Sequence, residues 1–318
     1  MRQIPAALAV LGLSALALTA CSAAPGDPAG CDRAASESTA LDLIDVTGEQ
    51  GQPSARTSAP VHVTETAFTD LTVGAGAAVT TRAQDIVFTT TVLNGTTGQT
   101  LLSSGTTVQQ VEQWATFSEG IATMLECATE GSRIVGAIAP DDLSDQAIAN
   151  MGLSEGDSAI FVIDLDKVYL PAADGAPQYV DGSGIPTVVL APDGRPGITV
   201  PDAEAPTDLV LKTLKKGDGE EVDGDATVRV HYTGVLWETG EVFDSSWEKG
   251  TTAAFGLDGV VPGFAEAIEG QTVGSQVLAV IPPELGYGDA GQGTIPGGAT
   301  LVFVVDILGI DEDAPTAQ

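Results

Sequence analysis

Cysteine and histidine, the usual ligands of transition metals in proteins, are few in this chain. Three cysteines and two histidines are scattered along 318 residues, at Cys21, Cys31, Cys127, His62 and His231. Zinc sites usually draw their ligands from closely spaced pairs, so this spacing predicts no transition-metal site. The acidic run 218–221 lacks the ligand pattern of a calcium loop. We therefore expect a protein without a protein-ligated transition metal.

Cys21 follows a segment with the features of an export signal. Met1-Arg2 is basic, residues 4–18 are almost wholly apolar, and Leu18-Thr19-Ala20 precedes the cysteine. The apolar run is too short for a spanning helix, which needs about 20 residues. The pattern resembles a bacterial lipoprotein signal peptide, so we expect lipidation of Cys21 and an extracytoplasmic protein held at the cell membrane by lipid alone. The alternative is an ordinary secretory signal with an incidental cysteine.

Cys31 and Cys127 remain as a pair in what would be an oxidising compartment. A disulfide between them is the simplest prediction. It would close a loop of about 97 residues and stabilise the fold by roughly 4–5 kcal/mol at most. The alternative is two unpaired thiols.

The charge balance narrows the range of partners. Asp and Glu number 44 against 12 Lys and Arg, which gives a formal charge of −32. Such a surface repels phosphate backbones and anionic headgroups. Nucleic acid is thereby excluded, and the membrane is reached only through the lipid. Gly (38) and Pro (18) are abundant, which favours strands and turns over long helices.

The chain also contains an internal repeat, which sets its architecture. A shift of 143 places Gly51-Gln52-Pro53 on Gly194-Arg195-Pro196, and a shift of 142 places Phe161 to Asp164 on Phe303 to Asp306. The matches run in the same order along both copies, so the sequence indicates a tandem duplication. We divide it into a signal peptide (1–20), a flexible tether (21–36), a first copy (37–170), a Pro- and Gly-rich linker (171–206), a second copy (207–311) and a tail (312–318).

The second copy has the periodicity of strands around one helix. Residues 228–233 alternate between apolar and polar types, which predicts a strand with one wet face. The apolar runs 277–281 and 301–305 predict covered strands. Phe264 and Ile268 stand four apart, Pro262 precedes them and Gly270 follows as a C-cap, which suits a short helix. We expect an α+β fold in which an antiparallel sheet wraps around a short helix. In the linker, Asp193-Gly194 favours a hairpin.

Several motifs of the second copy resemble those of the FKBP-type peptidyl-prolyl cis-trans isomerases. They occur in the family's order and cover about 207–311, roughly a third of the chain. The motifs are Val230-His231-Tyr232-Thr233-Gly234, Gly240 to Ser246, Val261-Pro262-Gly263-Phe264, Ile281 to Gly288, Ile295-Pro296 and Ala299 to Phe303.

The resemblance implies one proline-binding pocket. Its catalytic residues would be Tyr232, Phe243, Asp244, Phe264 and Tyr287, and its substrate-binding residues Val260, Val261, Ile295 and Phe303. Aromatic walls would hold the pyrrolidine ring, Tyr287 would donate to the substrate carbonyl, and Tyr232 with Asp244 would orient the site. The implied activity is prolyl cis-trans isomerisation of unfolded or exported polypeptides at the cell surface, without a cofactor.

Three positions depart from the family pattern. Phe264 replaces the usual Trp of the pocket floor, Lys249 replaces an Arg that pairs with the pocket Asp, and Ala253 replaces an aromatic residue. We therefore expect catalysis to survive and macrolides such as tacrolimus or rapamycin to bind only weakly.

The first copy resembles the same family in degenerate form. In our alignment Thr89 stands opposite Tyr232, Leu101 opposite Phe243, Leu102 opposite Asp244 and Phe117 opposite Phe264. The tyrosine motif 285–288 has no counterpart there. This loss leaves a second function class open, a non-catalytic peptide-binding chaperone or scaffold of the cell envelope.

Overall fold

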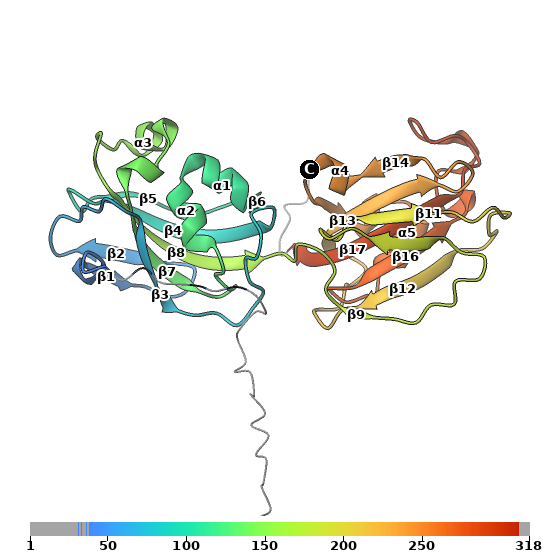
Figure 1. Cartoon of the computed structure of the whole chain (residues 1–318), viewed down its shortest axis with the longest axis horizontal. Helices are drawn as coiled ribbons and strands as arrows, with labels where there is room; N and C mark the ends of the chain where they lie inside the picture. The colour runs from blue at the N-terminus through green and yellow to red at the C-terminus, as the bar shows by residue number, and fades with distance from the viewer. Residues whose placement is uncertain (1–30, 32, 34–35, 37, 312–318) are drawn as a thin grey trace, which may run out of the picture. The chain divides into compact units, whose positions relative to one another are not determined.

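The computed structural model describes residues 31, 33, 36 and 38–311, which form two main antiparallel sheets with helices packed against them (Figure 1). The predicted signal peptide, Cys21 and the predicted tail 312–318 lie outside the described residues. Among the residues that are described, no helix is long and apolar enough to cross a membrane.

The first domain has eight strands and three α-helices. They are β1 (Ile44–Thr47), β2 (Ser54–Thr57), β3 (Ala67–Thr72), β4 (Asp85–Asn94), β5 (Thr100–Gly105), β6 (Gln109–Gln110), α1 (Val111–Phe117), α2 (Glu119–Leu125), β7 (Arg133–Ile138), α3 (Asp145–Met151) and β8 (Ala159–Val168).

The second domain repeats the main sheet of this plan and has two α-helices. Its elements are β9 (Ala176–Pro177), β10 (Thr187–Leu190), β11 (Pro196–Thr199), β12 (Val210–Lys216), β13 (Thr227–Leu236), β14 (Val242–Ser245), α4 (Ser246–Lys249), β15 (Ala253–Gly256), α5 (Pro262–Ile268), β16 (Gln276–Ile281) and β17 (Leu301–Asp311).

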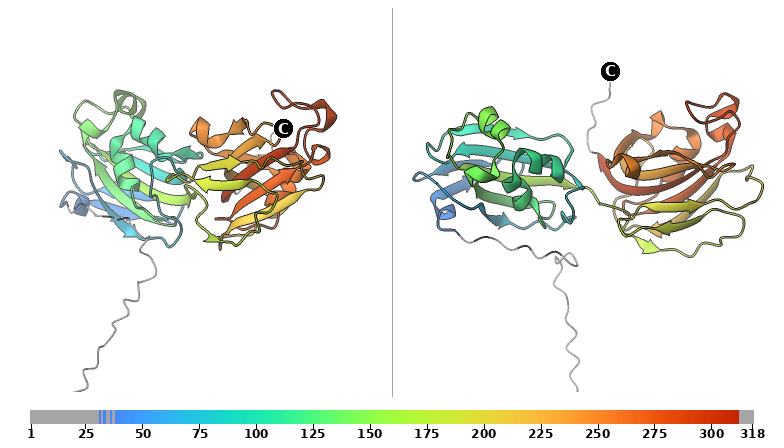
Figure 2. Two further views of the ribbon diagram at one scale, coloured as in Figure 1. Left: turned by 45° about the vertical axis from the view of Figure 1, so that its right-hand side comes forward. Right: turned by 45° about the horizontal axis from the view of Figure 1, so that its top comes forward.

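The two main sheets share one strand order, and Figure 2 shows these sheets from two further directions. It is β5-β4-β8-β7-β3 in the first domain and β14-β13-β17-β16-β12 in the second, with every neighbouring pair antiparallel. The α+β class and the tandem duplication expected from the sequence are both confirmed.

Strand register fixes how the two copies align. The long pairing of β4 with β8 is irregular between Val87 and Phe88, and that of β13 with β17 between Arg229 and Val230, which is a shift of 142. The same shift relates two hydroxyl pairs, each 3.0 Å apart: Thr91 with Ser103, and Thr233 with Ser245. An alignment of β4 with β13 at a shift of 143 is therefore wrong by one residue. The shift of 143 applies to the turns and the shift of 142 to this strand.

The helix of the second domain forms as its sequence predicts. Pro262 occupies the first turn of α5, where its missing N–H costs nothing. Gly270, with φ 72°, follows the end of the helix. The helix buries Phe264, Ala267 and Ile268 against the face of the sheet that β13, β16 and β17 present. This face of the sheet holds the candidate site.

The opposite face of the second sheet is covered by residues that the sequence assigned to a linker. Strands β10 and β11 form the expected hairpin. Ile185, Val188, Ile198 and Val200 pack against a cluster that contains Trp237. Most of the segment 171–206 is therefore a part of the second domain, and not a connector. The hairpin β1–β2 covers the equivalent face in the first domain, so each copy begins with its own hairpin.

The sequence predicted that one face of β13 would be exposed to water, and this prediction is wrong. His231 and Thr233 are buried. The Trp247 ring of α4 stacks on the His231 ring at 4.0 Å. Polar residues alternate along this strand because they bond to neighbouring hydroxyl groups, and not because they meet water.

Part of the predicted tether belongs to the first domain. The Arg33 guanidinium is bidentate to Asp70 at 2.5 and 2.6 Å and donates to the carbonyl oxygens of Met124 and Glu126. The Ser36 hydroxyl accepts from the Phe68 N–H at 3.0 Å. The tether therefore cannot extend freely to residue 36. Cys31 and Cys127 are both disulfide-bonded, and their pairing with each other stays a prediction.

Candidate functional site

Tyr232, Asp244 and Lys249 form a hydrogen-bonded chain on the helix side of the second sheet. The Tyr232 hydroxyl donates to Asp244 Oδ2 at 2.6 Å, and Lys249 Nζ lies 2.5 Å from Asp244 Oδ1. Tyr232 comes from β13, Asp244 from the edge strand β14, and Lys249 from α4, which immediately follows. A lysine makes this contact as a single point charge and not as a bidentate fork.

The charges of this chain are well defined. Burial raises the pKa of the Asp244 carboxyl, but the hydrogen bonds from Lys249 and Tyr232 outweigh it and hold the pKa below its usual range. Burial first, and then the bond to Asp244, raise the pKa of the Tyr232 hydroxyl. At neutral pH the site therefore contains a carboxylate and a neutral phenol whose proton is already committed to that carboxylate.

Aromatic rings line the space beside this chain. Phe303 is the hub, with its ring centroid 5.0 Å from that of Phe264, 5.3 Å from that of Phe243 and 6.2 Å from that of Tyr232. The contacts with Phe264 and Phe243 are edge-to-face, at 75° and 86°. Edge-to-face contacts are a preferred arrangement of aromatic pairs, so the rings form one packed aromatic wall.

The remaining predicted residues border the same core. Ile295 is buried in it, and Val260, Val261 and Tyr287 are partly buried and packed against it. Among the hydrogen bonds of the described residues, none uses the Tyr287 hydroxyl, so this group can donate to a ligand. The structure thus brings all nine predicted pocket residues into one region.

Phe255 is a member of this cluster that sequence reasoning did not assign to it. Its ring lies 5.7 Å from Tyr232 and 5.8 Å from Phe264. Phe255 reaches the cluster because β15 pairs with β13, which sets Phe255 opposite Val228. A short strand of four residues gave too little periodicity to reveal that pairing.

The first domain carries different residues at the corresponding positions. The register puts Thr90, and not Thr89, at the place of Tyr232, while Leu101 and Leu102 stand where Phe243 and Asp244 do. The helices α2 and α5 are seven residues long and 143 apart, so Ile121, and not Phe117, takes the place of Phe264. The polar chain and most of the aromatic walls are absent from this domain.

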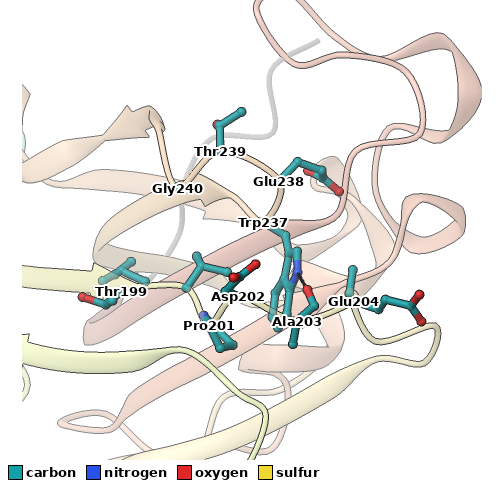
Figure 3. Close-up of a pocket in the computed structure, with 12 residues that line it drawn as sticks. Thr199, Pro201, Asp202, Ala203, Glu204, Trp237, Glu238, Thr239 and Gly240 are labelled. Carbon is teal, nitrogen blue, oxygen red and sulfur yellow. Dashed lines mark hydrogen bonds between the residues drawn. The ribbon is translucent and has the colours of Figure 1, made fainter.

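Two surface cavities of the second domain lie away from the aromatic cluster. One of about 660 Å³ lies between residues 198–205 and 237–240 (Figure 3). The Trp237 indole N–H there donates to the Ala203 carbonyl at 3.1 Å. The other, about 460 Å³, runs between the β10–β11 hairpin and β14. We place the site at the aromatic cluster because several aromatic rings lie there beside the Tyr232–Asp244 pair and the Tyr287 side chain.

His231 sits directly behind the site and is held neutral. Its Nδ1 lies 2.9 Å from the Ser246 hydroxyl, which also accepts the Tyr232 N–H. Burial lowers the pKa of His231 to about 4.

We expect this histidine to make the second domain acid-sensitive. The unfolded side chain takes up a proton near pH 6.5, whereas the folded one does so near pH 4. Stability is therefore lost as the pH falls from about 6.5 toward 4, by roughly 2–3 kcal/mol. Urea unfolding of wild type and His231→Gln at pH 7 and pH 4.5 checks this, because other titrations cancel in the difference. An equal loss in both proteins would contradict the assignment.

Taken together, the fold and the site define a class: an α+β domain with a cluster of aromatic side chains beside a hydrogen-bonded tyrosine–carboxylate pair. The family model described as FKBP-type peptidyl-prolyl cis-trans isomerase matches residues 218–308.

Individual proteins agree with this match. A probable FK506-binding protein of Corynebacterium glutamicum is 45% identical over 114 residues, which span 36% of this chain and 97% of that protein. The FK506-binding protein of Streptomyces anulatus is 41% identical over 120 residues, with the same two shares. The crystal structure of FkpA from Escherichia coli aligns at 35% identity over 41% of this chain and 53% of that one, with a TM-score of 0.32. The chain belongs to the FKBP-type peptidyl-prolyl cis-trans isomerase family.

Proposed function

We propose that the second domain catalyses cis-trans isomerisation of prolyl bonds in unfolded or exported polypeptides. The observation that carries this proposal is the aromatic cluster of Phe243, Phe264 and Phe303 beside the Tyr232–Asp244–Lys249 chain. A pyrrolidine ring is the small apolar group that such a cluster fits.

The geometry acts on the resonance of the amide. Rotation about the prolyl bond has a barrier of about 18–20 kcal/mol because the planar amide is stabilised by resonance. The planar form is also the more dipolar one, so a dry aromatic pocket favours the twisted form. Binding the twisted amide better than either planar form lowers the barrier without covalent chemistry.

The polar residues divide the remaining work. Tyr287 donates a hydrogen bond from its hydroxyl group to the carbonyl oxygen of the substrate as the amide twists. Tyr232 cannot do so while it donates to Asp244, and it serves to fix that carboxylate at the rim of the pocket. The proposed activity needs no cofactor.

A protein-refolding assay tests the proposed activity. We expect the soluble chain from residue 31 onward to accelerate the slow, proline-limited phase of a cysteine-free test protein, in proportion to enzyme concentration. Uncatalysed prolyl isomerisation takes tens of seconds or longer, so the acceleration is readily measured. A slow phase that is unchanged at every concentration would contradict catalysis.

The alternative role, peptide binding without turnover, is favoured for the first domain alone. Thr90, Leu101 and Leu102 leave it without the tyrosine–carboxylate pair. Macrolides remain possible ligands of the second domain, and we expect weak binding because Phe264 lacks the indole N–H donor of the usual tryptophan floor.

We further propose that the protein works at the outer face of the cell membrane, anchored through lipid on Cys21. Nine residues, 22–30, separate Cys21 from Cys31, and Arg33 is fixed to the first domain. Nine residues span at most about 30 Å even when fully extended, which is shorter than a tether ending at residue 36 would allow. The catalytic domain would then act where exported chains emerge unfolded.

Replacement of Cys21 tests the anchor. We expect Cys21→Ser to move the protein from the membrane fraction to the soluble exported fraction, with its turnover of a soluble peptide unchanged. Cys31→Ser, which spares the lipidation site, is the matched control and should stay with membranes. A Cys21→Ser protein that remains with membranes would contradict lipid anchoring.

A further inference from the structure

Gly234 lies directly beneath the aromatic wall of the site. In the sheet it is paired with Phe303 of β17 on one side and with Asp244 of β14 on the other. A Cβ atom on Gly234 would lie 2.5 Å from Cζ and 2.7 Å from Cε2 of Phe243, and 2.9 Å from Cε1 of Phe303. Carbon atoms do not approach so closely, so the space that a side chain would need is already filled by the two rings.

A β-bulge explains why the Phe243 ring occupies that space. The pairing of β13 with β14 is irregular between Gly234 and Val235, which leaves Phe243 as the extra residue. Bulges re-aim a side chain relative to a regular strand. The ring of Phe243 reaches across Gly234 and meets Phe303 edge-to-face at 5.3 Å.

The first domain supplies a natural comparison inside the same chain. Its bulge lies at the equivalent point, between Val92 and Leu93, with Leu101 as the extra residue. The position of Gly234 is taken there by Val92, which is fully buried. The copy with a branched side chain at this point thus carries no aromatic residue at the bulge, and the copy with glycine does.

We propose that Gly234 is a positioning residue of the prolyl pocket: its missing Cβ lets the Phe243 ring settle against Phe303. The expected effect of Gly234 on turnover rests on the proposed isomerase function. The contact between the Phe243 and Phe303 rings can be tested without any activity. Gly234 touches no substrate in this account and acts through Phe243.

The first test is Gly234→Ala in the full soluble chain. We expect kcat/KM for a prolyl peptide to fall about 3- to 10-fold, the factor that corresponds to the loss of one edge-to-face aromatic contact. The fold should survive because Phe243 lies half-exposed on an edge strand, where its ring can swing outward. Gly197→Ala is the matched control, since the nearest atom to its added Cβ, the Val189 carbonyl oxygen, is 3.5 Å away. It should leave kcat/KM unchanged.

A double-mutant cycle separates positioning from a general structural effect. In a Phe243→Leu background the two ring atoms nearest to the added Cβ are gone and only the 2.9 Å approach to Phe303 Cε1 remains. Gly234→Ala should therefore lower kcat/KM by a smaller factor there than in the wild-type background. An equal fold-change in both backgrounds would overturn the proposal. If Gly234→Ala does not fold, the double variant should recover folding, and its failure to do so would also overturn the proposal.

NMR gives a readout that is independent of turnover. We expect cross-peaks between the Phe243 and Phe303 rings in the wild-type protein and their loss in Gly234→Ala, with the Phe264–Phe303 cross-peaks retained. Cross-peaks that persist unchanged in Gly234→Ala would overturn the proposal. A wild-type protein without turnover but with these ring contacts would contradict only the proposed function.

Discussion

The double variant Phe243→Leu/Asp244→Leu will lose about 100-fold or more in kcat/KM for prolyl peptides and keep its fold. It removes an edge-to-face ring contact, worth about 0.5–1.5 kcal/mol, and a hydrogen bond to a charged group, worth about 1.5–3 kcal/mol. Each 1.4 kcal/mol is tenfold in rate. Both residues are half-buried on the edge strand β14, so leucine can be accommodated there. Peptide isomerisation kinetics and circular dichroism measure the two outcomes.

The first domain offers the matched control for this variant. Leu101→Phe/Leu102→Asp makes the reverse exchange at the equivalent positions and should leave turnover unchanged, because Thr90 and Ile121 still replace the tyrosine and the phenylalanine floor. A variant of the second domain that kept most of its activity would show that Phe243 and Asp244 do not form the pocket.

Separating the domains will place nearly all turnover in the second one. We expect residues 183–311 to have close to the kcat/KM of the whole soluble chain, and residues 31–170 to have none above background. The starting point matters, because 183–311 retains the β10–β11 hairpin over the back of the sheet. Kinetics of the two fragments at equal concentration test this, and turnover by 31–170 would contradict it.

A shorter fragment, 207–311, tests the hairpin itself. Without residues 183–206 it would expose Trp237, Val280 and Val302, which are buried under the hairpin. Burying apolar surface contributes about 25 cal/mol per Å², so we expect a lower melting temperature and aggregation. A fragment 207–311 as stable as 183–311 would show that the hairpin is only a connector.

Most of the fold could be predicted from the sequence because its signals are local. The strands at 277–281 and 301–305 and the helix at 262–268 each have their own periodicity and end signals, and the duplication appears in the sequence itself. The hairpin at Asp193-Gly194 was also predictable, but its docking on the sheet was not. Its apolar residues alternate over only four positions, and their partner, the cluster around Trp237, lies on strands far along the chain.

The pocket residues followed from the family motifs, whereas the details of their geometry depended on register. A one-residue error in aligning β4 with β13 placed Thr89 at the position of Thr90, since turns and bulges change the shift between copies from 143 to 142. The burial of His231 was hidden because alternation of polar residues is the same for a wet face and for a face covered by Trp247. Gly234 showed its importance only once Phe243 was known to lie on a bulge.

Exchange spectroscopy on a short prolyl peptide tests the central claim most directly. The soluble chain should raise the cis-trans exchange rate in proportion to its concentration, and the Phe243→Leu/Asp244→Leu variant should raise it about 100-fold less. Equal exchange rates with wild type, with the variant and with no protein would contradict an isomerase built from Tyr232, Phe243, Asp244, Phe264 and Phe303.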